Sequence, residues 1–357
     1  MPSATPSAIN QNQQQGWISN LRIIALLAVM VLHASSPLLG GYGRVPLSDW
    51  FAADFYNALT RFAVPVFVMI TGALSLGKDM ALTSFLKKRL GRIVVPFLFW
   101  SLVYIAYAFY NEDIVYSGNL LITTKQVLHQ LRDGSQYHLW YVYMLIGLYL
   151  IMPVLNKFIC HATNKEIVYF LMIWLLVMLF SQPYMARYNP VVDVRYYAGY
   201  IGYLVLGYYL ANRALKPGNI GGWMALLFVF SVGVITLGTF ALYRHYNGIS
   251  TLMYEPLSWP VVVLSSAMFL MVRLINIKLP AALIPVRDFI GKYNYGIYLA
   301  HALVLTLLEY DEQYTLSYKT FNPFLSIPVT AMVCFILSLL LVFIISKIPI
   351  IGKYISG

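Results

Sequence analysis

The sequence is poor in charge, and above all in acids. Only 10% of its 357 residues are charged, with 13 Asp and Glu against 24 Lys and Arg. Soluble domains carry about a quarter charged residues, so this scarcity excludes a cytosolic globular protein and a disordered chain. Cysteine is also scarce, and the two present, Cys160 and Cys334, are too few for a disulfide scaffold.

Hydrophobic residues are abundant, at 60%, and come in runs of about 16 to 23 residues. A helix needs roughly 20 such residues to cross a bilayer, whereas a β-barrel shows short alternating segments. The sequence therefore predicts an all-α, polytopic membrane helix bundle of about ten transmembrane helices. The expected spans are Trp17–Leu39, Asn57–Gly77, Ile93–Tyr110, Leu139–Val154, Ile167–Met185, Tyr196–Ala211, Gly222–Tyr243, Leu257–Val272, Tyr293–Leu308 and Leu325–Ile345.

The net charge of +11 has a topological cause, and we expect no nucleic-acid partner. With the N-terminus in the cytoplasm, the inner loops hold 15 Lys and Arg against three acids, and the outer loops hold seven against ten. The positive-inside rule then predicts that both termini are cytoplasmic (N-in, C-in).

Short segments flank these spans. Residues 1–16 are polar, uncharged and unlike a cleaved signal peptide, so we expect a disordered cytoplasmic tail before a transmembrane domain at 17–345, and a second tail at 346–357. The outer connection from Asn111 to His138 could hold an amphipathic helix around Leu120–Leu131. We expect no disulfide, because Cys160 falls in an inner loop and Cys334 in the last span.

No carboxylate lies within an expected span, and Glu309 stands only at an outer end. Proton- and sodium-coupled carriers usually rely on buried acids or broken helices, so this absence counts against a carrier. The buried ionisable groups are instead imidazoles, His33 deep in the first span and His301 deep in the ninth. Buried ionisable groups are functional candidates by default.

Arg22 and His33 stand eleven residues apart on the first span. Eleven residues bring a helix back to within about 20° of its starting direction, roughly 16 Å further along. One helix face thus offers a cation at the cytoplasmic end and an imidazole near mid-membrane. This suits a ligand with an anionic head and a long reactive arm: the guanidinium binds phosphates, and the imidazole accepts a proton from a hydroxyl. Alternatively, Arg22 is a membrane anchor and His33 a packing residue.

A second basic feature precedes the third span, where Arg89 and Arg92 share one helical face at spacing i, i+3. Gly91 between them would let a bulky anion approach the backbone. Basic clusters at inner helix ends are also common as simple anchors, and both interpretations stay open.

The ninth span carries Asn294, Tyr298 and His301 within about 60° of one another. His301 lies at a depth similar to that of His33, which suggests a shared cavity. A Tyr–His hydrogen bond that pins two helices together is the other interpretation.

His138 and Trp140 open the fourth span at the outer surface. Trp is typical of interfacial belts, but an exposed Trp beside His could also stack on a sugar ring. We expect no metal site, because the histidines of the outer loops are dispersed and form no metal-binding motif.

Taken in order, these motifs resemble the acyltransferase-3 family of integral membrane acyltransferases. The resemblance is to short members without a fused hydrolase domain, such as those that O-acetylate enterobacterial common antigen and other surface polysaccharides. It extends from Trp17 to about Ile345, with Thr71 where the family commonly has serine. It depends on Arg22 with ten residues to His33, Val64–Gly72, Arg89–Arg92 before Pro96, His138–Tyr141 followed by Pro153, and Gly296–His301.

The resemblance implies a multi-pass O-acetyltransferase of the bacterial inner membrane, with acetyl-CoA as cytoplasmic co-substrate, no metal, and a surface glycan or lipid-linked sugar as acceptor. His33 would act as general base or first accept the acetyl group, and Tyr298 and His301 would polarise the thioester or orient His33. The expected catalytic residues are His33, Arg22, Tyr298 and His301; the donor-binding residues are Arg89, Arg92 and Arg22; and the acceptor-binding residues are His138 and Trp140.

Two other functions stay open. One is a glycolipid or polysaccharide flippase or exporter without acyl-transfer chemistry, for which ten spans and outward aromatic residues would suffice. The other is a structural partner of a polysaccharide synthase. The sequence also leaves open the acceptor glycan, an acyl group other than acetyl, and a homo-oligomer.

Overall fold

A computed structural model of the chain describes residues 8–78, 81–116, 118–180, 199–215, 219–275, 277, 279–309, 316–349 and 352–356, with side chains from Gly16 onward except that of Lys353. Every regular element within these ranges is a helix, which confirms the expected all-α class. The chain divides into two compact units. Unit 1 comprises Met1–Lys78, Val154–Gly291 and Leu316–Met332, and unit 2 comprises Asp79–Pro153, Lys292–Thr315 and Val333–Gly357.

The helices follow the order of the expected spans. Unit 1 contains α1 (Ala8–Leu39), α2 (Leu47–Thr60), α3 (Ala63–Ser75), α7 (Asn164–Phe180), α9 (Ile201–Asn212), α10 (Ile220–Tyr246), η3 (Leu252–Tyr254), α11 (Trp259–Ile275) and η4 (Ala281–Leu283). Unit 2 contains α4 (Leu82–Tyr110), α5 (Leu120–Asp133), η1 (Tyr137–Leu139) and α14 (Gly352–Ile355). The helices α6 (Trp140–His161), α12 (Ile284–Glu309) and α13 (Pro323–Ile345) contribute residues to both units.

Seven segments of the described chain are long and apolar enough to cross a membrane: Gly16–Leu39, Leu47–Ser75, Leu82–Tyr110, Tyr137–His161, Ile220–Tyr246, Leu252–Ile275 and Pro323–Ile345. The other three expected spans correspond to α7, α9 and α12. The described parts of α7 and α9 have only 17 and 12 residues, and the expected spans continue into residues 181–198, outside the described ranges. The count of ten and the orientation therefore stay predictions.

Several helices begin earlier than the hydrophobic pattern indicates, among them α1, α4 and α12, the last at Ile284 rather than Tyr293. α1 starts at Ala8, so the described part of the tail that we expected to be disordered is helical, while residues 1–7 lie outside the described ranges. Glutamine is a good helix former, and no proline interrupts the chain between Ala8 and Pro37. α4 starts at Leu82 rather than Ile93, so the basic run before the third span belongs to the same helix.

The second span differs most from its prediction. It starts ten residues earlier, at Leu47, and consists of α2 and α3 with a short turn at Arg61 and Phe62. Pro65 explains the turn, because it has no N–H to donate to the carbonyl of Arg61. The earlier start brings Asp54 into the span, fully buried. The expectation that no carboxylate lies within a span is therefore wrong.

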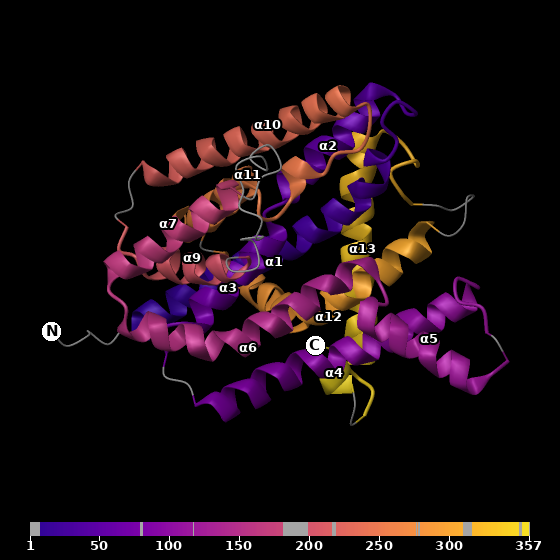
Figure 1. Cartoon of the computed structure of the whole chain (residues 1–357), viewed down its shortest axis with the longest axis horizontal. Helices are drawn as coiled ribbons and strands as arrows, with labels where there is room; N and C mark the ends of the chain where they lie inside the picture. The colour runs from indigo at the N-terminus through magenta and orange to yellow at the C-terminus, as the bar shows by residue number, and fades with distance from the viewer. Residues whose placement is uncertain are drawn as a thin grey trace. The chain divides into compact units, whose positions relative to one another are not determined.

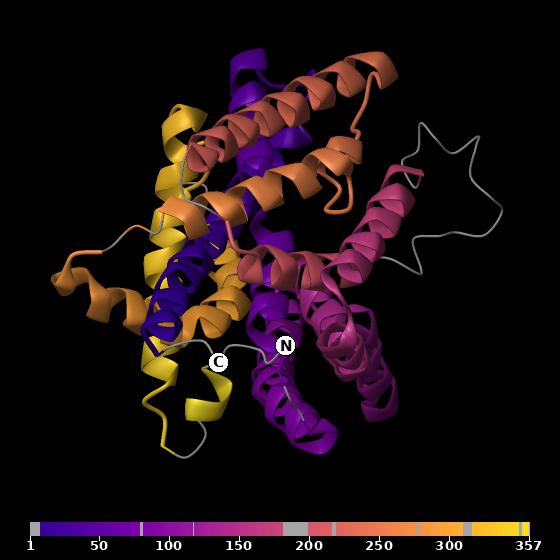
Figure 2. The same ribbon diagram turned by 90° about the vertical axis from the view of Figure 1, so that its left-hand side faces the viewer.

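Glycines allow α3 and α9 to pack with their backbones in contact within unit 1. A Cβ atom on Gly72 would lie 1.9 Å from the carbonyl oxygen of Leu204, and one on Gly207 would lie 2.0 Å from that of Met69. Such close approach of small residues is how membrane helices gain packing energy without a hydrophobic driving force between them. In the same unit α10 and α11 run side by side in both views (Figures 1 and 2).

Segment ends that the topology assigns to one side of the membrane lie together in unit 1. The backbone N–H of Gly77 donates to Asn156 Oδ1 at 2.7 Å, and Asn156 Nδ2 donates to the carbonyl of Lys78 at 2.7 Å. Arg273 Nη2 donates to the carbonyl of Arg213 at 2.8 Å. All of these residues belong to loops or helix ends that we expected on the cytoplasmic side.

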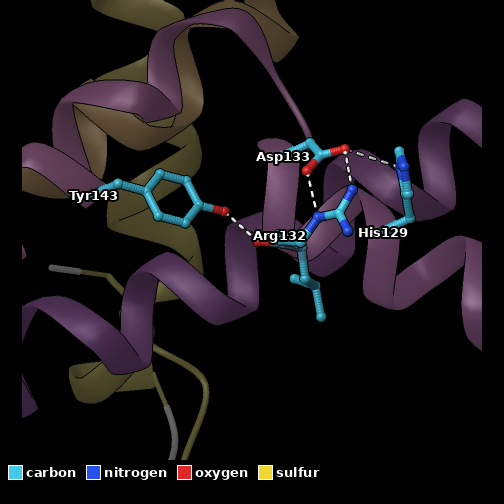
Figure 3. A network of polar contacts seen from close by, with 5 residues as sticks. His129, Arg132, Asp133 and Tyr143 are labelled. Carbon is cyan, nitrogen blue, oxygen red and sulfur yellow. Dashed lines mark hydrogen bonds and ion pairs between the residues drawn. The ribbon is translucent and has the colours of Figure 1, made fainter.

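The connection of unit 2 that we expected on the outer side holds the expected amphipathic helix, α5, which begins and ends close to the predicted limits. The side chain of Asn119 accepts from the N–H groups of Leu121 and Ile122 at its start, and Gly134 follows its end with a φ of 102°. At this end Arg132 and His129 both contact Asp133, and the Tyr143 hydroxyl donates to the carbonyl of Leu131 (Figure 3). The last bond fastens α5 to α6.

Candidate functional site

Helix α1 carries Arg22 and His33 without interruption between them. The helix geometry that places both side chains on one face therefore applies, and both are partly exposed. Pro37 lies one turn beyond His33, inside the same helix. Its ring nitrogen has no hydrogen to donate to the carbonyl of His33.

A buried polar network joins this end of α1 to α2. Asn57 Nδ2 donates to Ser35 Oγ at 2.6 Å, two residues along the chain from His33. Asn57 Oδ1 accepts from Arg61 Nη2 at 2.5 Å. The helix that carries His33 is thus held by a fully buried amide, since Ser35 and Asn57 are both 0% exposed.

The network continues from α2 to η3 through a carboxylate. The hydroxyl of Tyr254 donates to Asp54 Oδ1, and the guanidinium carbon of Arg61 lies 4.2 Å from the centre of the Tyr254 ring. Among the described residues, Asp54 Oδ2 and Arg61 Nε have no hydrogen-bond partner. An acid, a base and a phenol are therefore gathered in the interior of unit 1.

Sequence reasoning missed Asp54 because the hydrophobic run was judged to begin at Asn57. A signal was available. Asp54, Asn57 and Arg61 follow the spacing i, i+3, i+7, which places all three on one helical face. No comparable spacing pattern marked Tyr254, the partner of Asp54, which lies 200 residues further along the chain.

In unit 2, Arg89 and Arg92 lie on the continuous helix α4, so they share a face as expected. Arg92 is exposed, and the guanidinium carbon of the partly exposed Arg89 lies 5.9 Å from the Phe85 ring centre. A Cβ atom on Gly91 would meet no atom within 4 Å. The surface beside the two arginines is therefore open at this point.

The same unit brings together two histidines that lie far apart in the sequence. The rings of His138 and His301 are 4.8 Å apart between centroids, in an edge-to-face arrangement of 71°. Both are buried, at 1% and 0% exposure. The Tyr298 hydroxyl donates to the carbonyl of His138 at 2.6 Å, which fastens the turn η1 to α12.

The backbone fixes the protonation pattern of these two imidazoles. His138 Nε2 lies 3.3 Å from the carbonyl oxygen of Leu299, and His301 Nδ1 lies 2.5 Å from that of Tyr298. A carbonyl only accepts, so each of these nitrogens carries the proton. In the neutral rings, the lone pairs then lie on His138 Nδ1 and His301 Nε2.

The structure separates His138 from Trp140, which we expected as a pair facing the acceptor. Trp140 is 44% exposed, whereas His138 is buried against His301 and Tyr298. The reason is local. His138 lies in the 3₁₀ turn η1, and the α-helix starts only at Trp140, so the two side chains point in different directions.

Comparison with protein families decides the class. The family model described as an acyltransferase domain matches residues 15–347. The chain belongs to this acyltransferase family. No curated protein and no solved structure matches it.

For this acyltransferase, the predicted site residues fall into two groups. Arg22 and His33 lie in unit 1, and unit 2 holds Arg89, Arg92, His138, Trp140, Tyr298 and His301. The cavity that His33 and His301 were expected to share stays a prediction. Each group contains at least one imidazole, which can act as a base. Each also contains one or two arginines, which suit phosphate. Within the described residues, no group of three or more His, Cys, Asp or Glu could hold a metal ion.

Proposed function

We propose that this acyltransferase is an O-acetyltransferase of the bacterial inner membrane. It moves an acetyl group from cytoplasmic acetyl-CoA to a hydroxyl of a surface polysaccharide or of its lipid-linked precursor. The family match supports acyl transfer. One structural observation supports acetyl-CoA as the donor and its path through the protein. Arg22 and His33 lie on one face of the unbroken helix α1.

The chemistry follows from that arrangement. Nε2 or Nδ1 of His33 accepts the proton of the sugar hydroxyl as its oxygen attacks the thioester carbon. The C–S bond then breaks, and the imidazolium returns the proton to the CoA thiolate. If the acetyl group passes first to His33, a ring nitrogen bonds to the acetyl carbon as the C–S bond breaks and the CoA thiolate leaves. The sugar oxygen then attacks that carbon, the N–C bond breaks, and the hydroxyl proton passes through the imidazole to the thiolate. Atoms and charges balance in both routes.

Three arginines suit the phosphates of the donor. Arg89 and Arg92 share one face of α4 beside the open surface at Gly91, and Arg22 stands near the start of the expected first span. The planar guanidinium binds phosphate oxygens in pairs. We assign Arg89 and Arg92 to the phosphates of CoA. We assign Arg22 either to these phosphates or to the place where the pantetheine arm enters the helix bundle.

The buried histidine pair gives His301 and Tyr298 a supporting role. With its proton held on Nδ1 by a backbone carbonyl, His301 presents Nε2 as an acceptor that can orient a second imidazole or a hydroxyl. We move His138 from the acceptor surface to this group, because its ring packs on that of His301. Trp140 stays a candidate for stacking on the sugar, since it is exposed.

The deciding experiment uses purified full-length protein with labelled acetyl-CoA and a bacterial glycan acceptor. His33→Ala is expected to lower transfer at least about 100-fold, the usual contribution of a general base. The matched control is His245→Ala, since His245 is exposed at the end of α10. Both variants should keep the wild-type circular dichroism spectrum. Full transfer by His33→Ala would refute the proposal.

A transport function has one observation in its favour, because the buried Asp54 and the turn between α2 and α3 are features that carriers use. Donor binding separates the two functions. Acetyl-CoA should raise the melting temperature of the wild type but not that of Arg89→Ala/Arg92→Ala. Lys87→Ala/Lys88→Ala, two exposed neighbours on the same helix, is the control. A wild type that moves glycolipid and ignores acetyl-CoA would establish transport.

A further inference from the structure

A cavity of about 740 Å³ opens in unit 1 where the first turn of α7 meets the last turn of α9. Its volume falls within the range of about 300–1,000 Å³ that is typical of small-molecule sites. We call it the α7–α9 cavity. The side chains that the argument uses are Asn164, Lys165 and Val168 from α7, and Tyr209, Asn212 and Arg213 from the end of α9.

The described lining of the α7–α9 cavity holds two cations, Lys165 and Arg213, and no carboxylate. Among the described residues, neither Lys165 nor Arg213 forms an ion pair with a carboxylate, whereas Arg132 and Arg287 both pair with the aspartate that follows them. The acid next in sequence, Glu166, turns away, because its carboxylate accepts from the N–H and hydroxyl of Thr163 at 2.6 and 2.7 Å.

The negative end of α9 is also neutralised. Arg273 donates to the carbonyl of Leu210, in the last turn of α9, and to that of Arg213, the residue that follows the helix. The carbonyl dipoles at this end therefore do not offset the cavity's charge. The Arg213 guanidinium carbon lies 5.3 Å from the centre of the Tyr209 ring. Two cations and two amide side chains thus surround a space that suits a phosphate.

An apolar stripe leads away from the cavity along α7. It consists of Val168, Met172, Leu175 and Leu179, which are 38%, 60%, 36% and 45% exposed. Their spacing of four, three and four residues places them on one helix face. A neighbouring face of α7, about 100° around the helix axis, is buried at Ile167, Leu171, Trp174 and Met178. An exposed apolar stripe of this kind suits contact with lipid acyl chains.

We propose that the α7–α9 cavity binds the phosphate headgroup of an anionic phospholipid, with an acyl chain along the α7 stripe. Basic pockets between membrane helices on the cytoplasmic side are suited to such headgroups, and the expected topology places both Lys165 and Arg213 on that side. A soluble phosphate compound would use the cations but would leave the adjoining apolar stripe without a role. The proposal does not depend on the acetyltransferase chemistry.

The test is lipid retention by the full-length protein, measured by native mass spectrometry after purification with phosphatidylglycerol or phosphatidylcholine. The wild type should retain phosphatidylglycerol preferentially, and added salt should weaken this preference. Lys165→Gln and Arg213→Gln should each lower the affinity roughly fivefold. The controls are Lys157→Gln, an exposed lysine on α6, and Arg244→Gln, which like Arg213 stacks on an aromatic ring.

Three outcomes would overturn the proposal: equal retention of both lipids by the wild type, equal losses in the control variants, or displacement of the lipid by soluble CoA, which would make the cavity a donor site. If a variant does not fold, measurements on the wild type still test the proposal, because they show whether salt weakens phosphatidylglycerol retention and whether CoA displaces the lipid.

Discussion

Single residues matter most where an ionisable group is buried, and Asp54 is the clearest example. It is fully buried, it accepts from the Tyr254 hydroxyl, and it lies in the same network as Arg61. A buried charge persists only when its partners compensate for lost solvation. Asp54 therefore stabilises the arrangement of α2 and η3, whatever chemistry occurs on α1.

Replacing Asp54 tests this role. Asp54→Ala should destabilise the protein by on the order of 1–3 kcal/mol, because it leaves the Tyr254 hydroxyl buried without an acceptor. Asp54→Asn keeps an acceptor oxygen and should cost less. Denaturant unfolding in detergent measures both. Asp49→Ala, on the same helix but partly exposed, should have little effect; an equal effect would contradict the buried network.

At the scale of elements, α7 shows how a helix start is fixed by side chains. Thr163 and Glu166 form a capping box, in which the carboxylate accepts from the Thr163 N–H and the Glu166 N–H donates to the Thr163 hydroxyl. These hydrogen bonds to the N–H and hydroxyl of Thr163 lower the pKa of the Glu166 carboxyl below its ordinary value of 4.5. The helix start is therefore most stable when Glu166 is ionised.

The sign of the pH dependence follows from that lowered pKa. Since the folded state favours the ionised form, the contribution of Glu166 is present above pH 4.5 and is lost as the pH falls below it. Glu166→Ala should lower the melting temperature at neutral pH, and the difference from wild type should shrink in acid. Glu166→Gln, which can still cap, should retain much of the stability without this pH dependence. A constant difference at all pH values would contradict the capping role.

For the molecule as a whole, the side of the membrane on which each loop lies determines every functional assignment. Cys160 is an exposed free thiol at the end of α6, on the side expected to be cytoplasmic, and Cys334 is buried. An impermeant maleimide should therefore leave intact cells unlabelled and react with Cys160 only after permeabilisation.

The matched variant for this measurement is Lys125→Cys in a Cys160→Ala background, because Lys125 is exposed on α5 in the connection expected outside. It should be labelled in intact cells. The reverse pattern would show that both termini lie outside, and it would place Arg22, Arg89 and Arg92 away from cytoplasmic CoA.

Much of this protein could be predicted from its sequence because it depends on local patterns. Hydrophobic runs predicted the all-helical class, amphipathic periodicity predicted α5, and eleven-residue spacing related Arg22 to His33 on one helix. The limits of the second span could not be found in this way. Hydropathy places a polar residue such as Asp54 outside a span, but the hydrogen bond from the buried Tyr254 lets helix α2 include it.

The amino-acid sequence by itself determined the class of fold, the family and the order of the motifs, because hydrophobicity and helical spacing act over one or two turns. Only the tertiary structure decided that His138 packs on His301 rather than beside Trp140, that Asp54 meets Tyr254, and that α7 and α9 enclose a basic cavity. These contacts join residues far apart in the chain. They arise from how helices pack, through glycines and buried hydrogen bonds, and no local pattern specifies that.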